Sequence, residues 1–223
     1  MNTVLMEEDG KPRCRWCAAA PEFLHYHDVE WGFPVVDDIR LFEKICLEGF
    51  QSGLSWRTIL AKRDNFRRAF HGFDFNEIAN YTEQDVARLL ADAGIVRHRG
   101  KIEAVINNAA RAKEMVAKEG SLAAFLWKYE PASDSLAAPQ TASTSAESKA
   151  LSRDLKKLGW KFVGPTTVYA FMQAMGLINW PAADSDDTAL SFSSCLKLYR
   201  TDVPQRRMTS SEIAEAFDIV EHI

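Results

Sequence analysis

The sequence of 223 residues lacks the features that mark membrane and secreted proteins. It has no run of about 18 apolar residues, so no helical membrane span is expected. Its first residues lack the basic-then-apolar pattern of a secretory signal, so we expect a cytoplasmic protein. Only four cysteines are present, and in a reducing compartment we expect thiols or metal ligands rather than disulfides.

Positive charge is also scarce. The chain has 27 lysines and arginines against 31 aspartates and glutamates, a formal net charge of −4. Bulk electrostatic attraction to nucleic acid is therefore not expected, and any contact with DNA needs a local basic face. A metal-dependent hydrolase built on His27 and Asp28 would need further ligands, and the other histidines show no supporting spacing.

Helical periodicity dominates what is present. Neither an internal repeat nor a convincing pair of strands is found, so an all-α fold is expected. Thr82 and Asp85 have the spacing of a capping box that opens a helix. The length suits either a single helical domain over 1–223 or two small helical lobes within it. We expect helices over 38–49, 101–118, 151–158, 165–175 and 210–221, and a small, polar loop over 131–147.

The most informative segment joins two such helices through a short loop with a glycine near each end. Gly94 and Gly100 permit the left-handed backbone and close approach that a tight loop needs. Arg97, Arg99 and Lys101 add positive charge beside the amides that open the second helix, which suits a DNA phosphate. The segment alone equally favours a helix turn with solvated basic residues.

Glu48 lies on an apolar helical face. Leu41 and Ile45 precede it by two turns and by one turn, so helical geometry places this carboxylate among apolar side chains. Burial of a carboxylate is costly unless it has a partner or a task. Lys44, four residues earlier, offers a simple helix pair. A structural pair and a functional carboxylate are both open interpretations.

Aromatic residues flank this helix in the sequence. Tyr26 and Trp31 precede it, and a segment containing two glycines follows it and ends in Trp56. Aromatic rings on turns around a semi-buried carboxylate suit a pocket for a flat ligand, because rings stack on its faces and the carboxylate accepts hydrogen bonds from its edge. The alternative is that both tryptophans anchor the core.

Blocks of sequence extend this pattern along much of the chain. They are Cys14-Arg15-Trp16, Tyr26 to Gly32, Leu41 to Gly49, Gly53 to Trp56, Ala93 to Ile102, Lys161 to Gly164, Phe171 to Ala174 and Gly176-Leu177. In this order they resemble the bacterial DNA-3-methyladenine glycosylase I family of helix-hairpin-helix repair enzymes. The resemblance runs from about residue 13 to residue 179, interrupted around 131–147, and is absent from 1–12 and 180–223.

The resemblance implies a helix-hairpin-helix glycosylase fold with two helical lobes and the active-site pocket between them. It implies a base-excision repair enzyme that flips N3-methyladenine out of double-stranded DNA and hydrolyses its N-glycosidic bond. In the family, the carboxylate matching Glu48 recognises the base edge. The aromatics matching Tyr26 and Trp56 line the pocket, and the tryptophan matching Trp16 lies nearby. A monomer is expected, with free 3-methyladenine as product ligand and no cofactor for catalysis.

Methylation at N3 makes the purine cationic and a good leaving group, so a strong general acid is unnecessary. No aspartate occurs between Asp92 and Asp134, where many helix-hairpin-helix glycosylases place a catalytic aspartate, and the resembling family also lacks it. Lys101 lies roughly where bifunctional lyases carry a Schiff-base lysine, although a phosphate-contacting or solvated lysine is favoured. A glycosylase-lyase and a non-catalytic helical DNA-binding module are the alternatives.

The same family often holds a zinc ion through an N-terminal Cys and His and a C-terminal His and Cys. Cys14 and His27 match the first pair, but no second pair follows residue 179. Because a structural zinc wants four ligands, none is expected here. The residues available to a rewired site are Cys17, Cys195 and His222.

Overall fold

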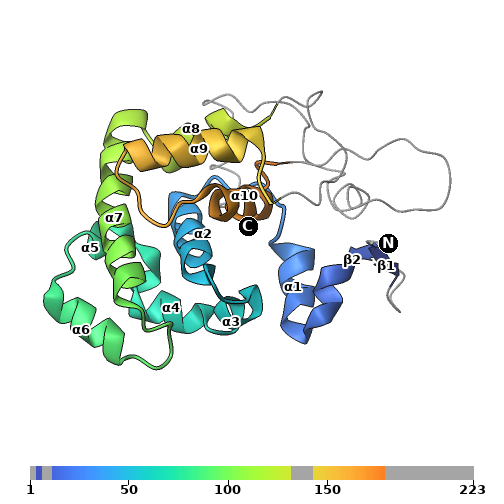
Figure 1. Ribbon diagram of the computed structural model, residues 1–223, viewed down its shortest axis with the longest axis horizontal. Coiled ribbons are helices and arrows are strands. Elements are labelled where there is room, and N and C mark those ends of the chain that lie inside the picture. Colours follow the sequence, from blue (N-terminus) through green and yellow to red (C-terminus); the bar gives the residue numbers. More distant parts are fainter. Residues whose placement is uncertain (1–3, 7–11, 132–142, 179–223) are drawn as a thin grey trace, which may run out of the picture.

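The computed structural model describes residues 4–6, 12–131 and 143–178, and its backbone there is almost entirely helical (Figure 1). No helix among these residues is long and apolar enough to cross a membrane. The elements are β1 (Val4–Met6), β2 (Pro12–Cys14), η1 (Arg15–Ala19), α1 (Pro21–Val29), α2 (Asp38–Gln51), α3 (Trp56–Ala61), α4 (Arg63–Ala69), η2 (His71–Phe73), α5 (Phe75–Ile78), α6 (Glu83–Ala91), α7 (Arg99–Glu119), α8 (Leu122–Leu126), η3 (Trp127–Tyr129), α9 (Ala146–Lys157) and α10 (Pro165–Ala174).

Capping residues set several helix boundaries. The Asp37 side chain accepts a hydrogen bond of 2.7 Å from the amide of Arg40 and so opens α2. Thr82 and Asp85 form the expected capping box at the start of α6. The helices expected over 38–49, 101–118, 151–158 and 165–175 are confirmed, with somewhat different ends.

Two expectations differ from the structure in detail. A short antiparallel pair of strands, with Val4 opposite Cys14, interrupts the all-α pattern, because strands of three residues are too short to show alternation in the sequence. The loop expected over 131–147 ends earlier, since α9 begins at Ala146. Positions 132–142 of that loop and the helix expected over 210–221 lie outside the described residues.

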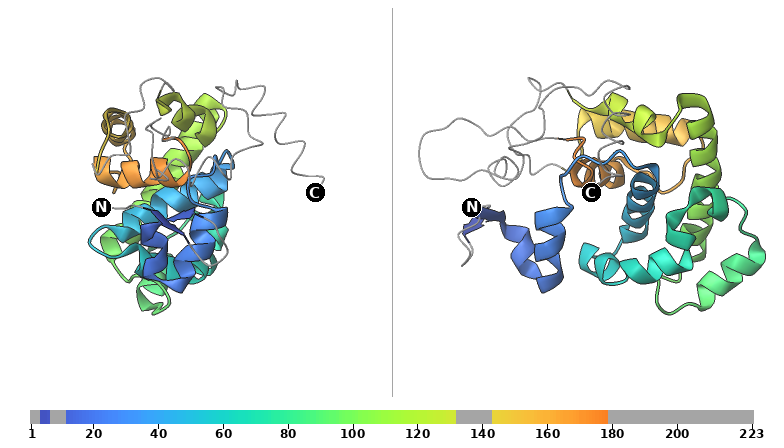
Figure 2. Two further views of the ribbon diagram at one scale, coloured as in Figure 1. Left: turned by 90° about the vertical axis from the view of Figure 1, so that its right-hand side faces the viewer. Right: turned by 180° about the vertical axis from the view of Figure 1, so that it is seen from behind.

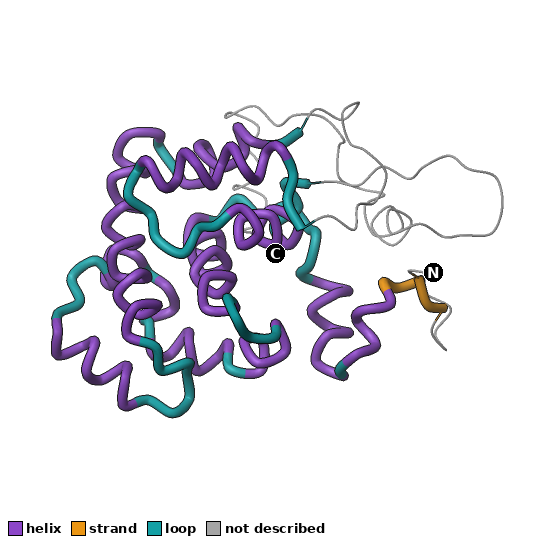
Figure 3. The backbone as a smooth tube through the Cα atoms, viewed as in Figure 1, coloured by secondary structure: helices purple, strands orange, loops and turns teal. Residues whose placement is uncertain are grey.

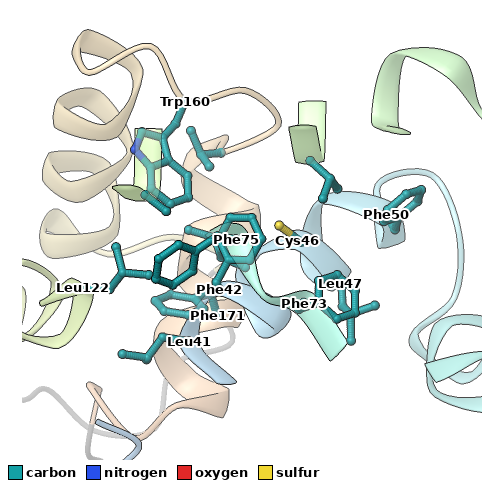
Figure 4. Packing of buried hydrophobic residues seen from close by; sticks show 14 of the residues in the cluster. Leu41, Phe42, Cys46, Leu47, Phe50, Phe73, Phe75, Leu122, Trp160 and Phe171 are labelled. Carbon is teal, nitrogen blue, oxygen red and sulfur yellow. The ribbon is translucent and has the colours of Figure 1, made fainter. Parts of the chain in front are cut away.

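Helix α2 lies at the centre of the fold (Figure 2). Every residue from Leu41 to Phe50 is buried, because other helices pack around it. The Phe42 ring contacts Phe75 of α5 and Trp160 after α9, with ring centroids 5.6 and 6.2 Å apart (Figure 4). Any charged residue on this part of α2 is therefore inside the protein.

The long helix α7 runs along one side of the fold. It begins at the loop after α6 and ends next to α8, and α9 packs against α10 (Figures 1 and 3). Helices α6 and α7 are joined by a short loop over 92–98, as the sequence predicts, and are called the α6–α7 hairpin below.

The end of α10 holds the segment between α1 and α2. The amide of Gly32 donates a hydrogen bond of 2.9 Å to the carbonyl oxygen of Ala174. Gly176 has a φ of +75°, and a Cβ there would lie 2.7 Å from the backbone nitrogen of Pro34, so only glycine fits. These contacts tie the segment between α1 and α2 to the end of α10.

Candidate active site

Helix α2 carries charged side chains into the interior. Glu48 lies on its last turn and is 5% exposed, as the sequence predicts. A carboxylate near a helix C-terminus faces the negative end of the helix dipole, so it needs positive charge nearby. Lys44, one turn earlier and 6% exposed, supplies that charge.

The Lys44 ammonium lies at the centre of a cluster formed by α1, α2 and α3. Its Nζ is 2.8 Å from Glu48 Oε1 and donates a hydrogen bond of 2.7 Å to Tyr26 Oη. It also lies 3.5 Å from the centroid of the Trp56 ring, a cation–π contact. The Tyr26 and Trp56 rings are 5.4 Å apart. The helix pair expected as an alternative is therefore present, and aromatic rings enclose it.

Burial sets the protonation behaviour of this cluster. Removal from water lowers the pKa of Lys44, and the charge and hydrogen bond of Glu48 oppose that shift. Burial, reinforced by the negative charge of Glu48, holds the pKa of Tyr26 well above its ordinary value. Tyr26 is therefore a neutral phenol that accepts a hydrogen bond from Lys44.

Further aromatic rings lie next to the cluster. Trp16 of η1 is 6.3 Å from Tyr26 and 5.3 Å from Trp31, centroid to centroid. The sequence predicts that the aromatic rings around Glu48 lie on turns. This is wrong for Tyr26, which belongs to α1, and for Trp56, which is the first residue of α3. Trp31 and Trp56 also pack against the core. Trp56 Nε1 is buried without a hydrogen-bond partner among the described residues, so the site holds an unsatisfied donor.

A neighbouring ion pair fixes the end of α1. Arg63 of α4 donates two hydrogen bonds to the Glu30 carboxylate, one of them 2.8 Å long. Although burial raises the pKa of Glu30, the hydrogen bonds and charge of Arg63 bring that pKa below its ordinary value. Sequence reasoning missed this pair, because the two residues lie on different helices.

The loop between α6 and α7 is held from α3 and α4. Lys62 Nζ and Asn65 Nδ2 each donate a hydrogen bond of 3.1 Å to the carbonyl oxygen of Gly94. A Cβ on Gly94 would lie 3.2 Å from the Asn65 side chain, so glycine permits the expected close approach. The left-handed backbone expected at Gly94 and Gly100 is wrong, and Gly100 lies in the first turn of α7.

The two arginines of this segment differ in their surroundings. Arg97 is exposed and makes no ion pair within the described part of the chain. Arg99 is also exposed, but its guanidinium lies 2.7 Å from Glu83 and 3.2 Å from Glu103. Arg97 is therefore available to bind a phosphate, whereas Arg99 has to leave its two carboxylate partners before it can bind one.

Lys101 does not lie on the exposed face with these arginines. Its side chain is buried, and Nζ donates hydrogen bonds of 2.8 Å to Phe50 O and 2.6 Å to Ser52 O. Burial lowers the pKa of Lys101. The expected solvated or phosphate-contacting lysine is thus corrected to one that caps the carbonyl end of α2 and ties it to α7.

The residues that match half of a zinc set make other contacts. His27 Nε2 accepts a hydrogen bond of 3.3 Å from the Cys14 amide, and Nδ1 lies 2.9 Å from Asp28 Oδ1. Among the described residues, no group of three or more His, Cys, Asp or Glu could hold a metal ion. Cys195 and His222, which a rewired zinc site would need, lie outside the described residues, so the absence of zinc stays a prediction.

Comparison with known proteins finds relatives along most of the chain. A family model described as methyladenine glycosylase matches residues 16–185. Over 171 residues the chain is 47% identical to DNA-3-methyladenine glycosylase 1 of Escherichia coli K12, covering 75% of this chain and 91% of the relative. It is 44% identical to the DNA-3-methyladenine glycosylase of Haemophilus influenzae, covering 75% of this chain and 92% of the relative.

Solved structures show the same similarity. A crystal structure of 3-methyladenine DNA glycosylase I matches with a TM-score of 0.70 and 47% identity, covering 75% of this chain and 94% of that one. A structure of 3-methyladenine DNA glycosylase I from Staphylococcus aureus, which describes the recognition of 3-methyladenine, matches with a TM-score of 0.66 and 38% identity. The match covers 71% of this chain and 86% of that one. A tyrosine-to-phenylalanine variant of 3-methyladenine DNA glycosylase I, in complex with 3-methyladenine, matches with a TM-score of 0.67 and 37% identity. The match covers 74% of this chain and 91% of that one.

Proposed function

The chain belongs to the methyladenine glycosylase family, and we propose that Glu48, Tyr26 and Trp56 form the pocket in which it carries out the family's reaction. The protein is an enzyme of base-excision repair. It removes N3-methyladenine from alkylated DNA by hydrolysis of the N-glycosidic bond and leaves an abasic site. The observation that carries the site assignment is the buried Glu48 carboxylate beside two aromatic rings.

The pocket suits a flat cation. The damaged base leaves the DNA stack to be reached, at a cost of about a few kcal/mol. Trp56 and Tyr26 offer it ring surfaces, and cation–π attraction favours a charged base over a neutral one. Glu48 accepts a hydrogen bond from the exocyclic amine and stabilises the positive charge. Trp16 packs against Tyr26 and supports its ring.

Recognition rather than acid catalysis is the main task of this site. A purine methylated at N3 already carries a positive charge, so its departure needs no strong proton donor. The protein has to flip the base, hold it and reject unmodified purines. A buried carboxylate and aromatic rings perform that discrimination in a site from which water is excluded.

The α6–α7 hairpin grips the DNA backbone in this proposal. Lys62 and Asn65 hold the loop in shape through Gly94. Arg97, Arg99 and the amides of the first turn of α7, including that of Gly100, then meet phosphates. This local basic surface accounts for DNA binding by a chain with a net charge of −4.

Chromatography of bases released from methylated duplex DNA tests the proposal. Wild type should release 3-methyladenine and little 7-methylguanine, and Glu48→Gln should lose most of this release. Glu43→Gln is the matched control, because its carboxylate lies on the same helix but pairs with Arg67 at 2.8 Å. Equal release by Glu48→Gln and wild type would contradict the role given to Glu48.

The rival functions have their own readouts. A non-catalytic DNA-binding module would bind duplexes without releasing a base. A glycosylase-lyase would use Lys101 as nucleophile, but its Nζ is held by two carbonyl oxygens, so we propose a monofunctional enzyme. We further propose a monomer that acts in the cytoplasm, where its DNA substrate lies. Catalysis needs no cofactor in this proposal, and elemental analysis should find well under one zinc per chain.

A further inference from the structure

Lys44 occupies the position that the proposed function gives to the methylated base. Its ammonium lies 3.5 Å from the Trp56 ring centroid and 2.8 Å from Glu48 Oε1. A purine stacked on the same face of Trp56 would meet the same ring and the same carboxylate. The two cannot lie there together, because both need van der Waals contact with one ring face.

The Lys44 ammonium also balances the negative charge of the buried Glu48 carboxylate. Among the described residues, the other buried or half-buried cations nearby are engaged elsewhere, Arg63 with Glu30 and Lys101 with carbonyl oxygens. If Lys44 left and nothing replaced its charge, a buried carboxylate would face the negative end of α2 alone. A cationic ligand therefore displaces the ammonium more readily than a neutral one does.

We propose that Lys44 and the methylated base exchange places in the pocket, so that the ammonium leaves the Trp56 face when a cationic base enters and returns after cleavage. This inference rests on the proposed function and makes Lys44 a specificity-determining residue rather than a catalytic one. The flexible four-carbon stem lets the head group move while the backbone stays on the buried helix.

The charge balance of the reaction gives the exchange its direction. When the bond between the base nitrogen and the sugar carbon breaks, both electrons go to the base, which becomes neutral. The sugar carbon takes the oxygen of water, and the proton passes to solvent. Glu48 thus faces a cation before cleavage and a neutral base after it. The returning ammonium then displaces the neutral product. Unmodified adenine is neutral throughout, so it is disfavoured in the same way, because it brings no charge to replace the ammonium beside Glu48.

Lys44→Met tests the exchange by removing the competitor. Free 3-methyladenine is the probe, and its affinity is measured by quenching of the protein's tryptophan fluorescence and by inhibition of base release. If the ammonium fills the site nine-tenths of the time, the apparent Kd of wild type is about tenfold weaker than that of an empty pocket. Lys44→Met should therefore bind free 3-methyladenine at least about tenfold more tightly. Unchanged or weaker binding would overturn the exchange, and Lys44→Arg, which keeps the cation, should bind it like wild type.

A second measurement uses wild type and needs no variant to fold. Lys44 Nζ lies 3.5 Å from the Trp56 ring centroid, so lysine-selective NMR should show the protons on the adjoining Cε shifted upfield. Saturation with 3-methyladenine should return them to an ordinary lysine position, whereas a persistent upfield shift would refute the exchange. Release of 3-methyladenine from methylated DNA by the same preparation reports separately on the proposed function.

Discussion

Glu48→Gln removes the negative charge that compensates the buried Lys44, and its effect on stability follows from that burial. Removing one partner of a buried ion pair costs about 3–5 kcal/mol, because the other charge is left inside the protein. The lysine stem lets the ammonium move toward water, so we expect the lower end of this range. For a chain of this size, 1 kcal/mol corresponds to about 2–4 °C in Tm. Glu48→Gln should therefore melt roughly 6–12 °C below wild type.

A double-mutant cycle separates this stability effect from the chemistry. Combining Glu48→Gln with Lys44→Met removes both charges and should recover most of the lost stability, with a coupling energy of about 1–3 kcal/mol in urea unfolding. The double variant should still fail to release 3-methyladenine, because the carboxylate is absent. Simple addition of the two single effects would show that the charges do not interact. Wild-type excision by the double variant would reduce Glu48 to the helix partner of Lys44.

Four further predictions concern Arg97, Lys101 and the ion pair of Arg63. Arg97→Ala should flatten the salt dependence of log K for DNA binding by about one unit regardless of sequence, and an unchanged slope in fluorescence anisotropy would mean that the loop touches no phosphate there. Lys101→Met leaves the buried Phe50 carbonyl without this donor, at about 1–3 kcal/mol, and also removes the part-buried hydrogen bond to Ser52, so its Tm should fall in circular dichroism. Borohydride should trap no covalent complex between wild type and abasic DNA, and a trapped complex that Lys101→Met abolishes would establish a lyase. Arg63→Met should destabilise the protein more at neutral pH than in acid. The lowered pKa of Glu30 means that its ion pair stabilises fully above the ordinary value of 4.5 and that this stabilisation is lost as the pH falls through the lowered pKa. Urea unfolding at neutral pH and at about pH 3 measures this, and an equal loss at both would contradict it.

Local features of the sequence were enough to predict the elements that carry the site. The spacing of Leu41, Ile45 and Glu48 predicted a buried carboxylate, and Lys44 stood at the spacing of a helix pair; both are found. The capping box of Thr82 predicted the start of α6, and the apolar spacing on each side of the following loop predicted the two helices that it joins. These features depend on helical periodicity and on hydrogen bonds within a few residues, so they can be recognised without knowledge of the fold.

Only the tertiary structure decided which partners meet across the chain. Lys101 was expected beside a phosphate, yet its ammonium reaches Phe50, 51 residues earlier, because α7 packs against the end of α2. Tyr26 and Trp56 lie on separate helices, and their packing places the Lys44 ammonium against both rings. Periodicity assigns a residue to one face of its own helix. Which side chain lies opposite depends on how the helices pack, and that is a property of the whole core.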